Sequence, residues 1–257
     1  MINPIKKRIF IALLILLGTS FIWLPIVNAY VKNESTVPPV GSIEDEPFSN
    51  QSSKAVTMIE VTLNNGSGGK ALSNGSGVII ELTATDFYVL TNYHVVSIDG
   101  YYPETIKIMD YLGNYYYGDL MIDNQILDIA SYSYDLALIK VVRTETLIEV
   151  ALPSSKEITL GMLVHSIGYP GKERKFTSGN VLQMEEIESL PFETIVHNAE
   201  ISQGSSGGAL LDSTGYLLGL NKSVTTNVVD GTFVSAQAIP LVKIKEYLQL
   251  FNIAYGG

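Results

Sequence analysis

A serine flanked by glycines is the first pattern in this chain that could do chemistry. Ser206 lies in the run Gly204-Ser205-Ser206-Gly207-Gly208, between two apolar stretches. A serine hydroxyl is a weak nucleophile alone, so it needs a base to accept its proton and amide donors for the oxyanion that forms. The chain has no cysteine, which excludes a thiol nucleophile, a disulfide and a thiolate metal site. The run therefore indicates either acyl transfer through a hydroxyl or a Gly-Ser loop without chemistry.

The order of residues along the chain separates the folds that use such a serine. The three histidines all precede Ser206 and are His94, His165 and His197. The glycine pattern also occurs in α/β-hydrolases, but in that fold the histidine follows the serine. A subtilisin-type order would put the acid before the histidine, and the sequence around His94 does not resemble that family. The order histidine, aspartate, serine remains, and it is that of the chymotrypsin-type double barrel.

Two further segments supply a histidine and an aspartate in that order. The segment of residues 89–96 is interpreted as a strand that ends at a histidine, His94, and Asp135 opens an apolar strand that continues to Val141. Together with the Ser206 run, they resemble the trypsin-like serine proteases, and most closely the HtrA (Deg) branch. Other segments resemble HtrA stretches in consistent order, including the family's early barrel turn, and these are Asn74–Val78, His165–Pro170, Ser178–Val181, Gly215–Asn221 and Ala238–Pro240. The resemblance extends roughly from residue 56 to residue 251.

The resemblance implies a role for each catalytic residue. Ser206 would be the nucleophile, His94 the general base and then the general acid, and Asp135 the group that orients the imidazole. The backbone amides of Gly204 and Ser206 would form the oxyanion hole. Ser205 competes with Ser206, and Asp123 and Asp128 compete with Asp135. We expect the rate to fall roughly below pH 6–7, because an imidazolium cannot accept the serine proton.

Specificity residues are implied less directly. The resemblance places Glu200, Ile201 and Asn221 near the specificity pocket. A carboxylate at residue 200 would favour Lys or Arg on the acyl side of the cut, whereas HtrA-like pockets imply a preference for small aliphatic residues. His165 lies within a probable core strand, and His197 is expected on the surface of a strand.

The chain departs from the HtrA pattern at several points. HtrA proteins usually have PGNSGGP around the nucleophile, and here Gln203, Ser205 and Ala209 replace Pro, Asn and Pro. None of the three supplies a catalytic group, so activity is not excluded. Many HtrA proteins carry a PDZ domain after the protease domain, and we expect this chain to lack one. HtrA proteins often form trimers through N-terminal segments that this chain does not obviously match, so its oligomeric state stays open.

The elements that must position these residues are mostly strands. Short apolar or alternating runs rich in β-branched residues are typical of strands, and these runs are residues 56–63, 77–82, 87–92, 105–110, 115–122, 136–142, 163–167, 179–184, 209–211 and 216–220. The resemblance implies an all-β fold with two six-stranded antiparallel β-barrels of the chymotrypsin/trypsin type. One segment breaks the pattern, because residues 240–251 place apolar residues at helical spacing behind Pro240. We expect one amphipathic C-terminal helix there.

The N-terminal region has a different composition. Three basic residues, Lys6, Lys7 and Arg8, precede an apolar run over residues 9–27, which indicates export or membrane insertion. Residues 1–29 therefore form a signal peptide or a transmembrane anchor, and both alternatives stay open. Residues 30–54 are rich in Pro, Ser and acidic residues and are expected to be a flexible linker. The protease domain would occupy residues 55–257.

Composition limits the partners. The 257 residues carry a formal net charge of −10, which would repel phosphate backbones and makes nucleic acid an improbable partner. Nothing indicates a metal or an organic cofactor. The sequence therefore predicts an extracytoplasmic serine endopeptidase that hydrolyses misfolded or exported proteins through an acyl-enzyme. The alternatives are a catalytically latent double barrel that binds peptides or proteins, and an enzyme that cuts only its own linker.

Overall fold

The computed structural model describes residues 51–98, 100–122, 125–144 and 148–256. The predicted N-terminal segment (residues 1–29) and most of the predicted linker (residues 30–54) lie outside the described residues. The last four linker residues form a short helix, α2 (Gln51–Lys54), in which Ser52 and Ser53 are buried. Ser52 Oγ accepts a hydrogen bond from the Leu152 amide at 3.0 Å, so this end of the predicted linker packs on the fold. No helix in the described ranges is long and apolar enough to cross a bilayer.

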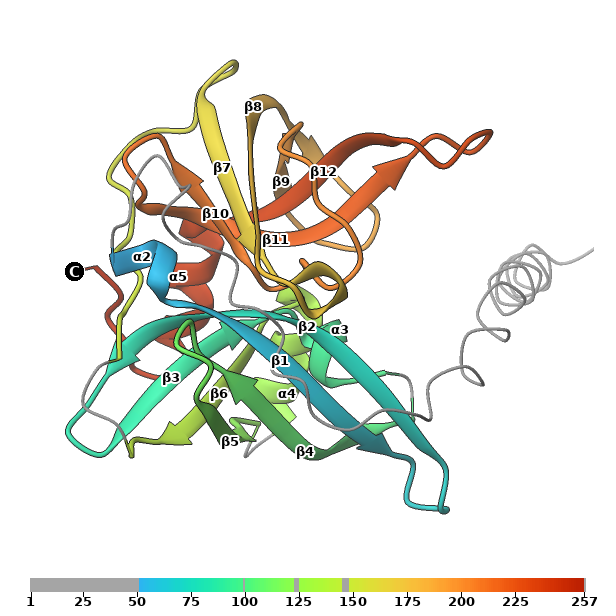
Figure 1. Ribbon diagram of the computed structural model, residues 1–257, viewed down its shortest axis with the longest axis vertical. Helices are drawn as coiled ribbons and strands as arrows, with labels where there is room; N and C mark the ends of the chain where they lie inside the picture. Colours follow the sequence, from blue (N-terminus) through green and yellow to red (C-terminus); the bar gives the residue numbers. More distant parts are fainter. Residues whose placement is uncertain (1–50, 99, 123–124, 145–147, 257) are drawn as a thin grey trace, which may run out of the picture. The chain divides into compact units, whose positions relative to one another are not determined.

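The described strands close into two six-stranded antiparallel barrels (Figure 1). The first barrel has the strand order β1-β2-β3-β6-β5-β4, with bounds β1 Val56–Asn64, β2 Lys70–Leu82, β3 Asp86–Thr91, β4 Tyr102–Met109, β5 Tyr115–Leu120 and β6 Ala137–Val142. The second has the order β10-β11-β12-β9-β8-β7, with bounds β7 Leu163–Gly168, β8 Lys175–Glu186, β9 Glu193–His197, β10 Ala209–Asp212, β11 Leu217–Thr226 and β12 Phe233–Pro240. The predicted fold class is confirmed.

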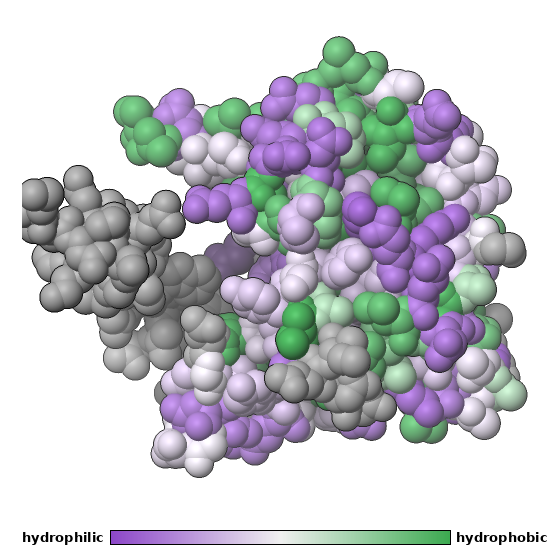
Figure 2. Space-filling view, turned by 180° about the vertical axis from the view of Figure 1, so that it is seen from behind, coloured by the Kyte–Doolittle hydropathy of each residue, from purple (hydrophilic) through white to green (hydrophobic). Residues whose placement is uncertain are grey.

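Apolar side chains fill both barrels. In the first barrel Phe87 is fully buried and packs edge-on against Tyr116, with ring centroids 5.2 Å apart. In the second barrel Val164, Ile195 and Leu210 are fully buried. On the face shown in Figure 2, hydrophobic residues are interspersed with hydrophilic ones. The burial explains why strand-length apolar runs were visible in the sequence.

A glycine-rich segment lies inside a strand where the resemblance suggested a turn. Residues 74–78 belong to β2, which begins at Lys70, seven residues earlier than the predicted run at residue 77. A Cβ atom on Gly75 would lie 2.8 Å from the Val95 side chain and 3.1 Å from the Ser206 carbonyl oxygen. Glycine is therefore needed here for the close approach of another backbone, and not for a reversal of the chain.

Two helices contact each other beside the barrels. The predicted C-terminal helix is confirmed as α5 (Leu241–Gln249), which follows β12 directly and is shorter than residues 240–251. A longer helix before β6, α4 (Gln125–Tyr134), was not predicted. Ile129 and Tyr132 are exposed on α4, so its sequence shows no clean apolar face. The buried Tyr247 hydroxyl on α5 forms a 2.8 Å hydrogen bond with Ser131 Oγ on α4, which ties the C-terminal helix to the segment before Asp135.

The connection between the barrels is bonded to both of them. The Ala151 amide donates to the Ile79 carbonyl of β2 at 2.8 Å. The next residue, Leu152, accepts a 2.8 Å hydrogen bond from the Leu217 amide of β11. The two barrels are thus linked by main-chain hydrogen bonds next to the strands that carry the candidate site.

Candidate active site

His94 reaches the site from a short helix. The sequence suggested a strand ending at this histidine, but β3 ends at Thr91, and His94 lies in α3 (Tyr93–Val96). The fully buried Asn92 side chain donates to the Asp135 carbonyl oxygen at 3.0 Å. This bond fixes the turn between β3 and α3 against the segment that carries the acid.

Asp135 terminates α4 in a conformation that usually belongs to glycine. Its φ is 52°, in the left-handed region. The Leu136 amide donates to the Ser131 carbonyl at 3.1 Å and the Asp135 amide to the Tyr132 carbonyl at 3.2 Å. These two bonds have the pattern of a Schellman cap with Asp135 at the left-handed position. A non-glycine residue there costs on the order of 1–3 kcal/mol, and such strain often accompanies function.

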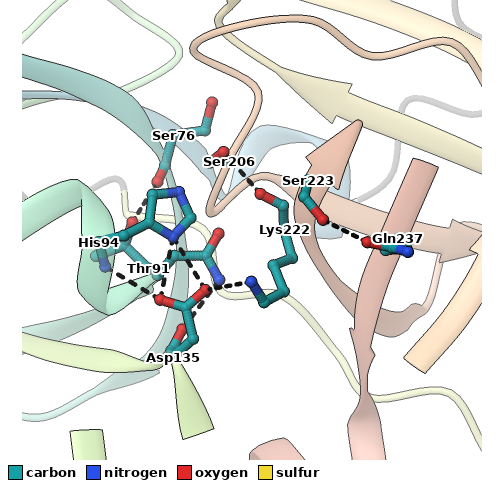
Figure 3. Close-up of polar contacts among 9 residues, drawn as sticks. Ser76, Thr91, His94, Asp135, Ser206, Lys222, Ser223 and Gln237 are labelled. Carbon is teal, nitrogen blue, oxygen red and sulfur yellow. Dashed lines mark hydrogen bonds and ion pairs between the residues drawn. The ribbon is translucent and has the colours of Figure 1, made fainter. Parts of the chain in front are cut away.

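The Asp135 carboxylate holds both the ring and the backbone of His94 (Figure 3). Nδ1 of His94 lies 3.0 Å from Oδ1 and 2.9 Å from Oδ2, and the His94 amide donates to Oδ1 at 3.1 Å. Burial raises the pKa of Asp135, but the hydrogen bonds and charge of His94 and the charge of Lys222 outweigh burial and hold that pKa below its ordinary value. The carboxylate is therefore ionised near neutral pH. It binds Nδ1 of the His94 ring, which leaves the other ring nitrogen, Nε2, for proton transfer.

The loop that carries Ser206 depends on two glycines. Gly204 has a φ of 99°, and a Cβ there would lie 2.8 Å from the Tyr169 carbonyl oxygen. Gly207 has a φ of 83°, and a Cβ there would overlap the Ser76 carbonyl oxygen at 2.1 Å. Both positions require glycine for conformation and for space. Gly207 is thus required by its contact with β2 of the first barrel, and Gly204 by its contact with the segment that follows β7.

Ser76 of β2 anchors this loop from the other barrel. Its buried hydroxyl donates to the Gly204 carbonyl at 2.7 Å and accepts from the Tyr169 amide at 2.8 Å. Its amide donates to the Ser206 carbonyl at 2.8 Å. Thr91 Oγ1 donates to the Ser76 carbonyl at 2.7 Å. One residue of the first barrel therefore positions both ends of the Gly204–Ser206 segment. This role of Ser76 was not predicted, because its partners lie far away in the chain.

Two amides of the loop have no partner. Within the described part of the chain, neither the Gly204 nor the Ser206 amide donates a hydrogen bond, whereas the neighbouring amide of Ser205 donates to Ser202 at 2.9 Å. Buried-loop amides are normally paired, so these two donors are available to an oxyanion. The rival Ser205 is buried, and its Oγ accepts from the Ser202 amide at 3.3 Å.

The Ser206 hydroxyl is turned toward β11. Its Oγ donates to the Lys222 carbonyl oxygen at 2.9 Å. Among the described residues, no hydrogen bond joins Ser206 Oγ to the His94 ring. The Lys222 side chain turns the other way, with Nζ 3.2 Å from Asp135 Oδ2 (Figure 3). One feature of the sequence distinguishes Lys222, which is the only charged residue between Asp212 and Asp230.

The three candidate specificity residues have different surroundings. The Glu200 side chain is 58% exposed, and its carboxylate lies 3.5 Å from Lys175 Nζ. Ile201 is buried. Asn221 is also buried, and its side-chain amide donates to Ser166 Oγ at 2.8 Å and to the Ala209 carbonyl at 3.0 Å. A contact that the sequence did not suggest joins Ser223 Oγ to Gln237 Oε1 at 2.6 Å beside Ser206 (Figure 3).

The other two histidines are structural. His165 lies in β7 and is buried as predicted, with Nδ1 2.9 Å from Ser178 Oγ. His197 was predicted to lie on a strand surface, but it is fully buried in β9. Desolvation lowers the pKa of His197 to about 4, and the Ala199 backbone and the Asn221 side chain offset only part of that effect. The predicted exposure is wrong because the four residues of β9 up to His197 are all buried, so both faces of the strand are covered there.

Comparison with known proteins supports the same class. A sequence model of the trypsin-like peptidase domain matches residues 75–220. The periplasmic serine endoprotease DegP of Salmonella typhimurium is 33% identical over 172 residues, which cover 63% of this chain and 33% of that protein. The chloroplastic Protease Do-like 5 of Arabidopsis thaliana is 30% identical over 204 residues, 73% of this chain and 60% of that protein. A solved HtrA-type protease with a tripeptide superposes with a TM-score of 0.64 at 25% identity, covering 77% of this chain and 60% of the other.

A double barrel with a histidine–aspartate pair facing a glycine-rich serine loop defines the class of trypsin-like serine proteases. The chain belongs to the trypsin-like peptidase domain family, and within it resembles the HtrA branch. The match with the first curated relatives spans about a third of their length.

Proposed function

We propose that the protein is an extracytoplasmic serine endopeptidase that acts through His94, Asp135 and Ser206. The observation that carries the proposal is the bidentate contact of Asp135 with His94 Nδ1 beside a serine loop that has two unpaired amides. Membership of the trypsin-like peptidase family supports it. The proposed substrates are misfolded or exported proteins, in keeping with the periplasmic names of several relatives.

The proposed reaction assigns each proton and bond. His94 Nε2 takes the proton of Ser206 Oγ as the oxygen attacks the peptide carbonyl carbon. The resulting oxyanion accepts hydrogen bonds from the Gly204 and Ser206 amides. His94 then gives the proton to the leaving amine, the C–N bond breaks, and an acyl-enzyme remains on Ser206. Water activated by His94 hydrolyses this ester and restores the serine.

Ser206 must rotate before it reacts. In the resting structure its hydroxyl donates to the Lys222 carbonyl, so a change of χ1 has to bring Oγ to His94 Nε2. Side-chain rotation takes place on a picosecond to nanosecond timescale at exposed sites. It therefore need not limit turnover once the substrate is in place.

The N-terminal segment defines the proposed location. A basic start followed by an apolar run of residues 9–27 supports export. We propose that the domain acts outside the cytoplasm, either released after cleavage or held at a membrane by residues 1–29. Its proposed partners are protein and peptide substrates.

Labelling with a fluorophosphonate tests the proposal directly. The full chain, kept in mild detergent, is incubated with the reagent, and the intact mass is measured. We expect one adduct on the parent and none on Ser206→Ala, with His94→Ala strongly slowed. Ser205→Ala is the matched control, because it changes the neighbouring serine, and it should retain the adduct. An adduct on Ser206→Ala, or loss of the adduct only in Ser205→Ala, would contradict the assigned nucleophile.

A latent binding protein is the second candidate, and one observation favours it. The Ser206 hydroxyl is bonded to Lys222 and not to His94. If a well-folded parent shows no adduct, this resting arrangement persists in solution. The same sample would then be tested for peptide binding by fluorescence anisotropy, where saturable binding without cleavage supports the latent form.

A further inference from the structure

Lys222 is a nearly buried cation in the site. Its side chain is 11% exposed, and Nζ lies 3.2 Å from Asp135 Oδ2. A buried ammonium needs a partner, since an unpaired buried charge is strongly unfavourable. Asp135 is the only ion-pair partner that the described residues provide for Lys222. The acid that holds His94 is therefore shared with a second cation.

Among the described residues, Lys222 and His94 are the basic side chains that pair with the Asp135 carboxylate. On α3, Tyr93 precedes His94, and its hydroxyl donates to Asp128 of α4 at 2.9 Å. On β9, His197 is neutral in the working pH range, because its pKa lies at about 4. On β12, the uncharged Gln237 pairs with Ser223, the residue after Lys222. The Asp135 carboxylate thus contacts both the His94 ring and the Lys222 ammonium.

Lys222 contacts both ends of the catalytic arrangement. Its side chain contacts the acid, and its main-chain carbonyl accepts the Ser206 hydroxyl. The two contacts can be separated by mutation, because a substitution at residue 222 changes the ammonium and keeps the carbonyl. This property allows the charge to be tested alone.

We propose that Lys222 is a positioning residue that extends the working range of His94 toward lower pH by placing a fixed positive charge on the shared carboxylate. The inference rests on the proposed function of the same site. A protonated His94 ring would form a second cation on a carboxylate that already binds one. Protonation of the resting base is therefore disfavoured, and the base stays competent in more acidic solution.

The expected size follows from the geometry. Lys222 Nζ and His94 Nδ1 bond the same oxygen at 3.2 and 2.9 Å, so they lie no more than about 6 Å apart. By Coulomb's law, one unit charge at that separation shifts the titration midpoint of another by about 0.5 pH unit at the dielectric constant of water. The shift is about 2 pH units at the lower dielectric constant typical of a site near a protein surface. The His94 side chain is 47% exposed, so we expect a shift of about 1 pH unit.

The test compares pH profiles of the full-length protein. The second-order rate of fluorophosphonate labelling and kcat/KM for a peptide substrate are measured from about pH 4.5 to 9. In Lys222→Met the acid midpoint should move up by about 1 unit, and in Lys222→Arg it should stay near the parent value. Lys156→Met is the matched control, because Lys156 pairs with the buried Asp212 away from the site, and its midpoint should not move.

The outcomes separate the two proposals. An unchanged midpoint in a folded Lys222→Met overturns the role of Lys222, even when the parent is active. If circular dichroism shows that Lys222→Met does not fold, Lys222→Gln replaces it, and an unchanged acid midpoint in that variant likewise overturns the role of Lys222. If the parent itself is never labelled, the proposed function fails, and the role of Lys222 fails with it.

Discussion

Removing the Ser76 hydroxyl should weaken both the fold and the active site. The substitution Ser76→Ala removes the donor to the Gly204 carbonyl and the acceptor of the Tyr169 amide. Ser76 is fully buried, so water cannot easily replace either bond. Each buried group left unpaired costs about 1–3 kcal/mol. We therefore expect the free energy of unfolding to fall by about 2–4 kcal/mol.

The effect on catalysis follows from the position of the loop. The Gly204 carbonyl is held by Ser76, and the Gly204 amide is a proposed oxyanion donor. Loss of one oxyanion donor reduces kcat by about 10²–10³. Displacing a donor is less severe than deleting it, so we expect Ser76→Ala to lower kcat/KM by about 10–100-fold.

Urea unfolding and peptide hydrolysis measure the two effects. Circular dichroism should follow unfolding, because the only tryptophan of the sequence, Trp23, is not among the described residues. Ser73→Ala on the same strand is the control, since the Ser73 side chain forms no hydrogen bond among the described residues, and it should stay within about 0.5 kcal/mol of the parent. A Ser76→Ala protein as stable and as active as Ser73→Ala would refute the idea that this hydroxyl holds the loop.

Three further predictions address the loop, the buried histidine and the specificity residue. Gly207→Ala, whose Cβ would lie 2.1 Å from the Ser76 carbonyl oxygen, should abolish fluorophosphonate labelling, and Gly231→Ala, which meets no atom within 4 Å, should leave it intact. The pKa of His197 is about 4 in the folded state and about 6.5 in the unfolded state, so the unfolded state binds the proton first as the pH falls. The free energy of unfolding should therefore fall by about 3 kcal/mol from about pH 6.5 to about 4. Urea unfolding of the parent and of His197→Phe should differ in this pH dependence, and an equal dependence would argue against the buried neutral histidine. Glu200 is exposed and paired with Lys175, so Glu200→Gln should change the ratio of kcat/KM for peptides with Arg and Val at the cut by less than about twofold, and a strong Arg preference lost in the variant would contradict this.

Local sequence was sufficient to predict ten of the twelve described strands and the chain order of the proposed triad, because both depend on short patterns. Apolar runs such as residues 137–142 report burial directly, and the His94, Asp135 and Ser206 segments each carry their own motif. The described structure adds strands that were not among the predicted runs, β9 and β12, and the helices α2, α3 and α4. The exposed apolar residues of α4 conceal its period.

Contacts between distant residues could not be predicted in the same way. Ser76 and Gly204 are 128 residues apart, and nothing near either residue identifies the other. Lys222 looks like an ordinary surface charge until β11 brings it to Asp135. His197 was expected on a strand surface, but it is fully buried in β9 of the closed second barrel. Burial set by barrel closure is a tertiary property that periodicity alone does not record.

The anchoring of the Ser206 loop on β2 has a consequence for how such a chain is made. The first barrel, with His94 and Asp135, is synthesised before the second, and domains tend to fold in that order. The serine loop obtains its hydrogen bonds from Ser76 only after the second barrel has docked. A chain that is still being made would therefore carry His94 and Asp135 without the formed Ser206 loop. Under the proposed function, it could not digest itself or neighbouring nascent chains before the second barrel has folded.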